Sequence, residues 1–139
     1  MSETLTVCGL TIERGTKLRT YLPVPDTNVK IPLTIINGEK DGPTLLITAG
    51  IHGGEYPGIA AAMELGRDIE PEHVTGCLIM MHPVNIQGFW ARREMIVPED
   101  GKNLNRVFPG DPTGTLADKT AYLISNNFFP IADFYVDMH

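Results

Sequence analysis

Apolar and polar residues alternate through the first third of the chain, in three short segments. These segments are Leu10–Glu13, Leu18–Val24 and Ile31–Asn37. Turn residues follow them at Asn37-Gly38 and at Asp41-Gly42-Pro43. Alternation with period two is typical of strands that have one buried face. The pattern therefore predicts an antiparallel β lead-in over residues 1–43.

The pattern changes at Thr44, where a nearly continuous apolar run begins. Such a run is typical of a strand that is covered on both faces. We expect strands at Thr44–Ala49, Cys77–His82 and Ala132–Met138, helices at Ile59–Ile69 and Leu116–Phe128, and a loop over Gly50–Pro57. Strands that alternate with helices predict an α/β protein, here a three-layer αβα fold with a mixed, largely parallel sheet.

The length of 139 residues predicts one domain, with the β lead-in at 1–43 and an α/β core at 44–139. The sequence ends at His139, directly after a predicted central strand. A sheet that stops there leaves a strand edge uncovered. We therefore expect a catalytic-type domain that is incomplete at its C-terminal side. A missing C-terminal segment, a second chain or a homo-oligomer would cover the sheet.

The chain is acidic, with 11 Lys+Arg against 17 Asp+Glu and a net charge of −6. This balance argues against a nucleic-acid partner and against a polybasic membrane anchor. The N-terminus has no basic or apolar leader, and no apolar stretch approaches the ~20 residues of a membrane span. Cys8 and Cys77 stand beside apolar residues, which predicts buried free thiols. We expect a cytoplasmic protein.

The loop after the Thr44–Ala49 strand contains His52 and Glu55, three residues apart between glycines. An imidazole and a carboxylate at this spacing can converge on one Zn²⁺ ion. Glycines in such a loop permit close backbone approach. The alternative is a surface loop in which Glu55 caps the next helix.

His139 follows a strand that we expect to run parallel to Thr44–Ala49. Both histidines would then lie at the same edge of the sheet. Two His and one Glu leave a coordination position open for water, which is typical of catalytic zinc. Asp137, on the same strand face as His139, is a candidate to support the ligand or to line the pocket. Taken without His52, His139 reads as a frayed terminal residue.

Cations gather between positions 92 and 106, in a loop region that begins with Arg92 and Arg93 and ends with Asn105 and Arg106. A guanidinium matches a carboxylate in shape and charge, and an amide beside it adds a neutral partner. A positive site in a negative protein suits a small anionic substrate. The alternative is a set of solvated charges balanced by the acidic residues of the same loop, Glu94, Glu99 and Asp100.

Other candidate residues have plainer interpretations. We expect His82 to be a hydrogen-bonded structural histidine and His73 to be exposed in a polar turn. We expect Phe89 and Trp90 to pack in the core or in a loop rather than to bind substrate.

Three motifs together carry a resemblance: His52-Gly-Gly-Glu55, the run Asn103-Leu-Asn-Arg-Val-Phe-Pro-Gly110, and Asp137-Met-His139. In order and spacing they resemble the succinylglutamate desuccinylase/aspartoacylase family, relatives of the zinc carboxypeptidases. The resemblance covers Thr44 to His139. It implies one zinc ion held by His52, Glu55 and His139, with Asn105 and Arg106 gripping the substrate carboxylate. It also implies an arginine that faces the scissile carbonyl, for which Arg92 aligns best and Arg93 is the second choice.

The sequence departs from the family pattern at two points. Asn103 stands where the carboxypeptidase relatives have an aspartate that accepts a hydrogen bond from the first zinc histidine. An amide can also accept that bond, without adding negative charge. The family also implies a glutamate general base beyond the third ligand, and no glutamate follows Glu99 in this sequence.

The resemblance therefore implies a zinc-dependent hydrolase that cleaves the amide bond of an N-acylated amino acid or a similar small carboxylate. One alternative is a zinc peptidase of carboxypeptidase type. Another is a non-catalytic, truncated metal-binding fragment. We expect the 139-residue chain alone to be inactive.

Overall fold

The computed structural model describes residues 3–139. Met1 and Ser2, which belong to the N-terminal segment inspected for a leader, lie outside the described residues. The strands are β1 Thr4–Val7, β2 Leu10–Glu13, β3 Thr16–Pro23, β4 Lys30–Asn37, β5 Lys40–Ala49, β6 Thr75–Met81 and β7 Phe134–Met138. The helices are α1 Tyr56–Asp68, α2 Ile86–Trp90 and α3 Leu116–Asn127, with short 3₁₀ turns η1 Pro71–His73, η2 Leu104–Arg106 and η3 Phe129–Ile131.

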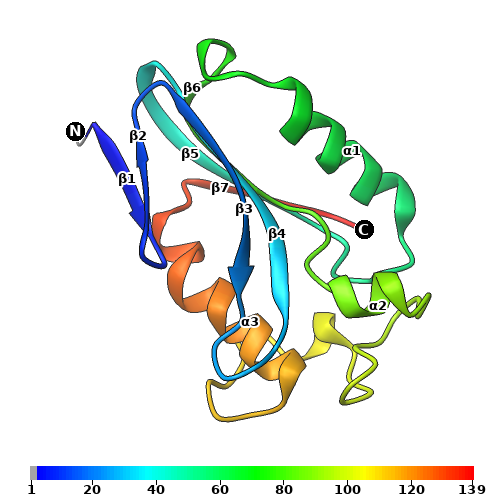
Figure 1. The fold of residues 1–139 in the computed structure, drawn as a ribbon. Helices are drawn as coiled ribbons and strands as arrows, with labels where there is room; N and C mark the ends of the chain where they lie inside the picture. Colours follow the sequence, from blue (N-terminus) through cyan, green and yellow to red (C-terminus); the bar gives the residue numbers. More distant parts are fainter. Residues whose placement is uncertain (1–2) are drawn as a thin grey trace.

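The main sheet has the strand order β3-β4-β6-β5-β7, and β1 and β2 form a separate hairpin beside it (Figure 1). β3, β4 and β6 pair antiparallel, whereas β5 pairs in parallel with β6 on one side and with β7 on the other. Parallel strands end at the same sheet edge, where ligands of open α/β sheets collect. The carboxyl ends of β5, β6 and β7 therefore meet at one edge, as expected from the sequence.

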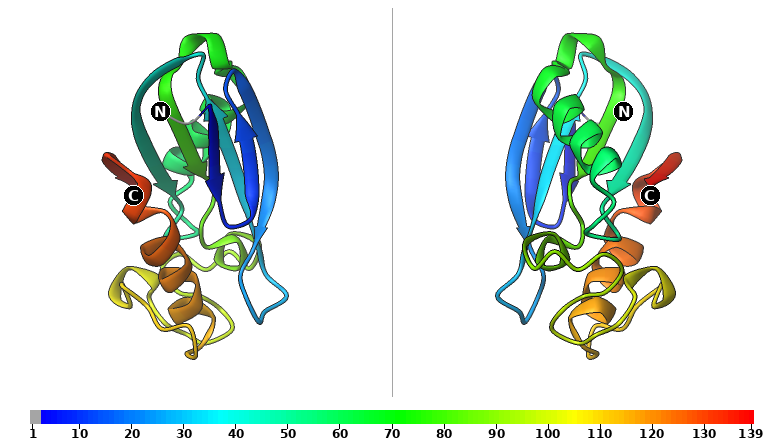
Figure 2. Two further views of the ribbon diagram at one scale, coloured as in Figure 1. Left: turned by 90° about the vertical axis from the view of Figure 1, so that its left-hand side faces the viewer. Right: turned by 90° about the vertical axis from the view of Figure 1, so that its right-hand side faces the viewer.

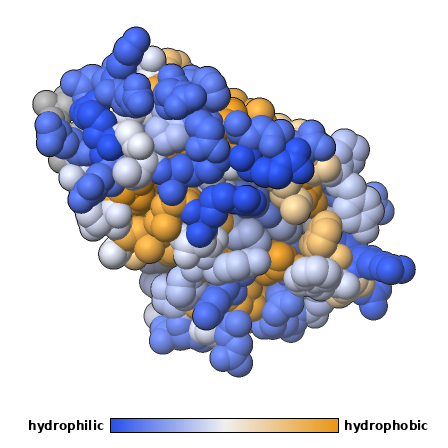
Figure 3. All heavy atoms as spheres, turned by 45° about the horizontal axis from the view of Figure 1, so that its top comes forward, coloured by the Kyte–Doolittle hydropathy of each residue, from blue (hydrophilic) through white to orange (hydrophobic). Residues whose placement is uncertain are grey.

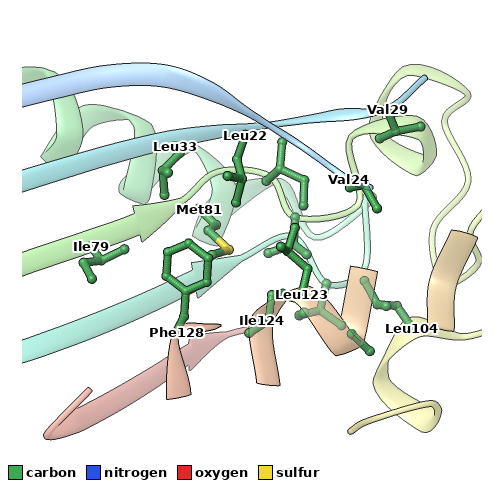
Figure 4. Close-up of a cluster of buried hydrophobic side chains, with 14 of the residues drawn as sticks. Leu22, Val24, Val29, Leu33, Ile79, Met81, Leu104, Leu123, Ile124 and Phe128 are labelled. Atoms are coloured by element: carbon green, nitrogen blue, oxygen red, sulfur yellow. The ribbon is translucent and has the colours of Figure 1, made fainter. Parts of the chain in front are cut away.

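Helices cover both faces of this sheet, which confirms the predicted three layers. Gly66 of α1 packs against Thr34 and His82 on one face. Figure 2 shows α1 in front of the strands in one side view and behind them in the other. α3 packs on the opposite face, where Leu123, Ile124 and Phe128 meet side chains of the strands (Figure 4).

The largest core cluster lies between α3 and the sheet, and its strand residues alternate along β4 as period two requires. Ile31, Leu33 and Ile35 are all 1% exposed or less and belong to this cluster. Ile36 faces the other side, in a smaller cluster with Ile47, Leu78 and Met80. Both faces of the central strands are therefore buried, in agreement with their nearly continuous apolar sequence.

Most predicted elements are present, with boundaries that differ by a few residues. The turn expected at 41–43 is instead an irregularity within β5, where the register with β6 shifts between Lys40 and Thr44. α1 begins at Tyr56, three residues before its predicted start, because Pro57 suits the first turn of a helix. The strand β1 and the short helix α2 were not predicted.

The prediction that Cys8 is buried is wrong. Cys8 and Gly9 form the two-residue turn between β1 and β2, with φ values of 49° and 76°. Two successive residues with positive φ give the hairpin turn that fits the twist of the strands. Cys8 is therefore exposed at the tip of the hairpin, while Cys77 is half-buried, and both are free thiols.

Within residues 3–139, β7 is an edge strand that pairs with β5 alone, so its other edge is uncovered, as expected. Phe134 and Val136 of β7 are 62% and 45% exposed. Elsewhere polar residues cover most of the face shown in Figure 3, and apolar residues form separate patches between them. Among the described residues, no helix is long and apolar enough to cross a membrane.

Candidate metal centre

The loop that follows β5 turns sharply, and two of its glycines are required by their surroundings. Gly50 has φ of 72°, and a Cβ there would lie 2.5 Å from Pro83 Cβ. A Cβ on Gly53 would lie 2.4 Å from the backbone nitrogen of Phe89, at α2. Only glycine fits such a close backbone approach. The loop is thereby pressed against α2, and His52 between these glycines is buried, at 7% exposure.

Glu55 is the residue that precedes α1, yet its carboxylate does not cap the helix. Its Oε1 lies against His52 Nδ1, and its Oε2 is 3.5 Å from His139 Nδ1. This arrangement excludes the alternative in which Glu55 serves as a helix cap. The carboxylate faces two imidazoles instead.

The structure brings His139 to the other two predicted ligands. Met138 at the end of β7 packs near Gly58 of α1, so the end of β7 lies beside the first turn of that helix. The rings of His52 and His139 have centroids 5.2 Å apart. One ligand atom each from His52, Glu55 and His139 can be chosen so that all lie within 4.8 Å of one another.

The hydrogen bonds of the two rings set the direction of their lone pairs. Asn103 Oδ1 accepts from the backbone N–H of Asn105 at 3.0 Å, which identifies this atom as the amide oxygen. His52 Nε2, at 2.9 Å from the same oxygen, must therefore be the donor. His139 Nε2 donates to Asp137 Oδ2 at 2.8 Å. In the neutral rings, both Nδ1 lone pairs then point toward Glu55.

This donor set fits a divalent metal. Neutral imidazoles in this arrangement direct two lone pairs at a carboxylate, and only a proton on each Nδ1 or a shared cation removes the repulsion. Metal-bound histidines usually donate their other ring nitrogen to a carboxylate, a carbonyl or water, as both do here. Two His and one Glu form a common catalytic zinc set. The three residues are therefore a candidate zinc centre.

The predicted substrate-binding pair lies in the turn that contacts this centre. Asn103 precedes η2, and its side chain bonds both His52 and the backbone of Asn105. The expected contact between Asn103 and the first histidine is thus present. Asn105 and Arg106 follow within the same short turn, Asn105 half-buried and Arg106 exposed.

The base of this loop is anchored to the start of α3. Asp100 Oδ2 accepts from the backbone N–H of Ala117 at 2.8 Å and from Thr115 Oγ1 at 2.7 Å. Lys102 forms an ion pair with Asp118. Leu104 is fully buried in the main core. These contacts hold the turn 103–106 in place while leaving the Arg106 guanidinium in solvent.

Arg92 and Arg93 both lie in the exposed loop after α2. Arg92 has φ of 53°, a left-handed conformation that is costly for a residue with a Cβ. Across residues 3–139, neither guanidinium makes a hydrogen bond or an ion pair. Which of the two faces a substrate carbonyl stays a prediction.

The other candidates divide as follows. His82 is buried and bonds Thr34 Oγ1 at 2.8 Å, which confirms its structural role. His73 is exposed, as predicted. Phe89 packs against the cluster around Ile59, but Trp90 is 72% exposed, with its ring in a T-shaped arrangement with the Phe89 ring. The prediction that Trp90 is packed is therefore wrong, because α2 ends there at the surface.

Two residues near the centre were missed in the sequence. Thr48 Oγ1 is 2.8 Å from Asp137 Oδ1 and 2.7 Å from the Tyr135 hydroxyl. Tyr135, Asp137 and His139 alternate along β7, and this spacing could have been read as a shared face. The part played by Thr48 depends on the register of β5 with β7, which pairs Thr48 with Asp137.

Known proteins match this chain closely. Residues 41–139 match the succinylglutamate desuccinylase/aspartoacylase catalytic domain. An N-α-acetyl-L-2,4-diaminobutyric acid deacetylase from Halomonas elongata is 40% identical over 126 residues, which are 86% of this chain and 36% of that protein.

Solved structures agree with these matches. A succinylglutamate desuccinylase/aspartoacylase from Rhodobacter sphaeroides is 36% identical with a TM-score of 0.84, over 99% of this chain and 43% of that one. The product-bound ectoine utilization protein EutE (DoeB) from Ruegeria pomeroyi is 35% identical with a TM-score of 0.86, over 100% of this chain and 44% of that one. The chain thus spans less than half the length of these relatives. By sequence and by fold, it belongs to the succinylglutamate desuccinylase/aspartoacylase family.

Proposed function

We propose that this chain forms the metal-binding part of a zinc-dependent hydrolase that removes the acyl group from an N-acylated amino acid or a similar small carboxylate. The observation that carries the proposal is the convergence of His52, Glu55 and His139, with both imidazole Nδ1 atoms facing the carboxylate. Relatives with the same family domain are deacylases by name, which supports amide cleavage.

The residues of the chain divide the work by their positions. Bound by this set, zinc would polarise a substrate carbonyl and make water nucleophilic near neutral pH. Asn105 and Arg106 would bind the substrate carboxylate, because an exposed guanidinium beside an amide offers several convergent donors. Arg92, or Arg93, would stabilise the negative charge that develops on the carbonyl oxygen. The proton-accepting glutamate implied by the family would come from outside these 139 residues.

The test uses the full-length protein as its gene encodes it, purified with and without added zinc. Bound metal is measured by mass spectrometry, and hydrolysis is followed for N-acetyl-2,4-diaminobutyrate, N-succinylglutamate and N-acetylaspartate. Short peptides with a free C-terminal carboxylate are assayed in parallel, because the alternative is a carboxypeptidase-type enzyme. We expect one zinc per chain and turnover of at least one acyl amino acid, abolished by a chelator and restored by zinc.

A substitution at the turn 103–106 tests the substrate-binding role. Arg106→Ala should raise KM about tenfold or more, because it removes a charge-assisted contact, while bound zinc stays unchanged. Arg67→Ala is the matched control, since Arg67 is an exposed arginine on α1 that pairs with Asp68. Turnover of peptides alone, or full activity in zinc-free protein, would contradict the proposal.

A further inference from the structure

The third proposed ligand, His139, is held by side chains that come from two neighbouring strands. Asp137 Oδ2 accepts from His139 Nε2, while Asp137 Oδ1 accepts from Thr48 Oγ1. Thr48 is fully buried on β5, and the strand register places it directly opposite Asp137 on β7. The carboxylate therefore has one oxygen on the ligand and the other on the core of the sheet.

The direction of each hydrogen bond among Tyr135, Thr48 and Asp137 follows from the chemistry of the three groups. An ionised carboxylate only accepts, so the single hydroxyl hydrogen of Thr48 is given to Asp137. The Thr48 oxygen is then left to accept from the Tyr135 hydroxyl, at 2.7 Å. Burial raises the pKa of Tyr135, so the phenol keeps its proton near neutral pH. Tyr135 therefore donates to Thr48 and Thr48 donates to Asp137, while His139 donates to the other oxygen of Asp137, so the carboxylate accepts from both sides.

Aromatic packing holds Tyr135, the member of this hydrogen-bonded series that lies farthest from His139. The Tyr135 ring contacts Phe129 with centroids 5.0 Å apart, and Phe129 stacks on Phe108 at 6.2 Å. Phe108 lies just beyond the turn 103–106. The tyrosine hydroxyl is thus fixed by a stack of rings that starts near the proposed substrate-binding turn.

From this geometry we propose that Tyr135, Thr48 and Asp137 form a hydrogen-bonded chain that positions His139, holding its ring in the Nε2–H tautomer with Nδ1 free to bind metal. The inference rests on the proposed function only for the identity of the bound metal. On its Nε2 side, His52 has instead a single neutral partner, the amide oxygen of Asn103. His139 is more exposed than His52, with 42% of its side chain accessible against 9%. Its ring therefore has more rotational freedom, which must be restricted for metal binding.

The first experiment measures zinc affinity of the full-length protein by competition with a chelating indicator. Asp137→Ala should weaken binding about 10- to 100-fold, the usual effect of removing the outer partner of a metal histidine. Thr48→Val, which keeps shape but removes the hydroxyl, and Tyr135→Phe, which keeps the ring, should weaken it by successively smaller factors. Thr48→Ser, which restores the hydroxyl, should recover most of the affinity.

A matched control separates positioning from general packing. Thr34 is also a fully buried threonine, and its hydroxyl bonds His82, a histidine outside the metal centre. Thr34→Val should lower thermal stability as much as Thr48→Val does, yet leave zinc affinity unchanged. An equal loss of zinc affinity in both variants would overturn the proposal.

The second experiment reads the ring directly, without metal. Long-range ¹H–¹⁵N spectra of the zinc-free protein, at a pH where imidazoles are neutral, report each histidine tautomer. We expect the Nε2–H form at His139 in the wild type, a mixture in Thr48→Val and Asp137→Ala, and no change at His52. If all variants had the same His139 tautomer and the same zinc affinity, the proposed positioning of His139 by these hydrogen bonds would be overturned. The expected tautomers without any zinc binding would instead overturn the proposed function.

Discussion

His82 follows β6 and His139 follows β7, the two strands that pair in parallel with β5 on its two sides. The register places them one residue apart in height, since Ala49 pairs with Met138 while Thr48 pairs with Met81. Successive residues of a strand point to opposite faces. His82 accordingly lies under Gly66 of α1, whereas His139 lies with His52 and Glu55 at the candidate metal centre.

The His82 and His139 rings lie on opposite faces of the sheet, and their hydrogen-bond partners also differ. His82 has a neutral hydroxyl from Thr34 and is buried, and this burial lowers its pKa. His139 has a carboxylate on Nε2, a second carboxylate near Nδ1, and 42% of its side chain exposed. His82 therefore suits a place in the core, whereas Nδ1 of His139 faces the Glu55 carboxylate, as Nδ1 of His52 also does, and this arrangement suits both rings to hold a metal. Position at the sheet edge alone does not decide the role.

The largest expected effect separates the two histidines by metal binding. His139→Ala removes a proposed ligand and should weaken zinc binding more than about 100-fold, beyond the loss caused by removing an outer partner. His82→Ala should leave zinc affinity within a factor of about two while lowering stability by about 2 kcal/mol or more, because it leaves Thr34 unpaired and opens a cavity. Competition with a chelating indicator and urea unfolding measure the two quantities. Comparable zinc loss in both variants would remove the distinction.

A smaller effect tests whether the charge of the partner matters. His52 has a neutral amide on Nε2, where His139 has a carboxylate. Asn103→Asp should strengthen zinc binding about tenfold, because a carboxylate that accepts the Nε2–H makes Nδ1 of the same ring a more basic metal ligand. Asn105→Asp is the control, since it adds the same charge in the same turn without touching His52. An equal gain from both substitutions would assign the effect to net charge rather than to the hydrogen bond.

These contrasts show which features the sequence could predict. The three proposed ligands could be predicted because His52 and Glu55 are close in sequence and His139 ends a strand of recognisable pattern. Asp137 could be found from its spacing to His139. The role of Thr48 could not, because it depends on a register between strands that lie 89 residues apart in the chain.

The errors in the fold have similar physical causes. Cys8 looked like a buried residue because its neighbours are apolar, but the positive φ of the two-residue turn takes it to the surface. The irregular start of β5 was read as a turn because Gly42 and Pro43 are turn residues, although pairing with β6 continues the strand through them. In each case a local preference was overruled by strand pairing.

The smallest expected effect concerns the loss of folding stability that the buried His82 causes at acid pH. Burial, followed by the nearby charge of Arg19, lowers the pKa of His82 below its ordinary value of 6.5. The unfolded chain then binds a proton more readily than the folded one as the pH falls below 6.5, so this stability is present above 6.5 and is lost as the pH falls through the folded pKa. His82→Gln keeps a side chain that can bond Thr34 but does not titrate. Urea unfolding from pH 7.5 to pH 5, with a chelator present, should show a shallower loss of stability in this variant. Since the two proteins differ only at residue 82, the difference between the two curves reports His82, and parallel curves would mean that its burial has no effect on acid stability.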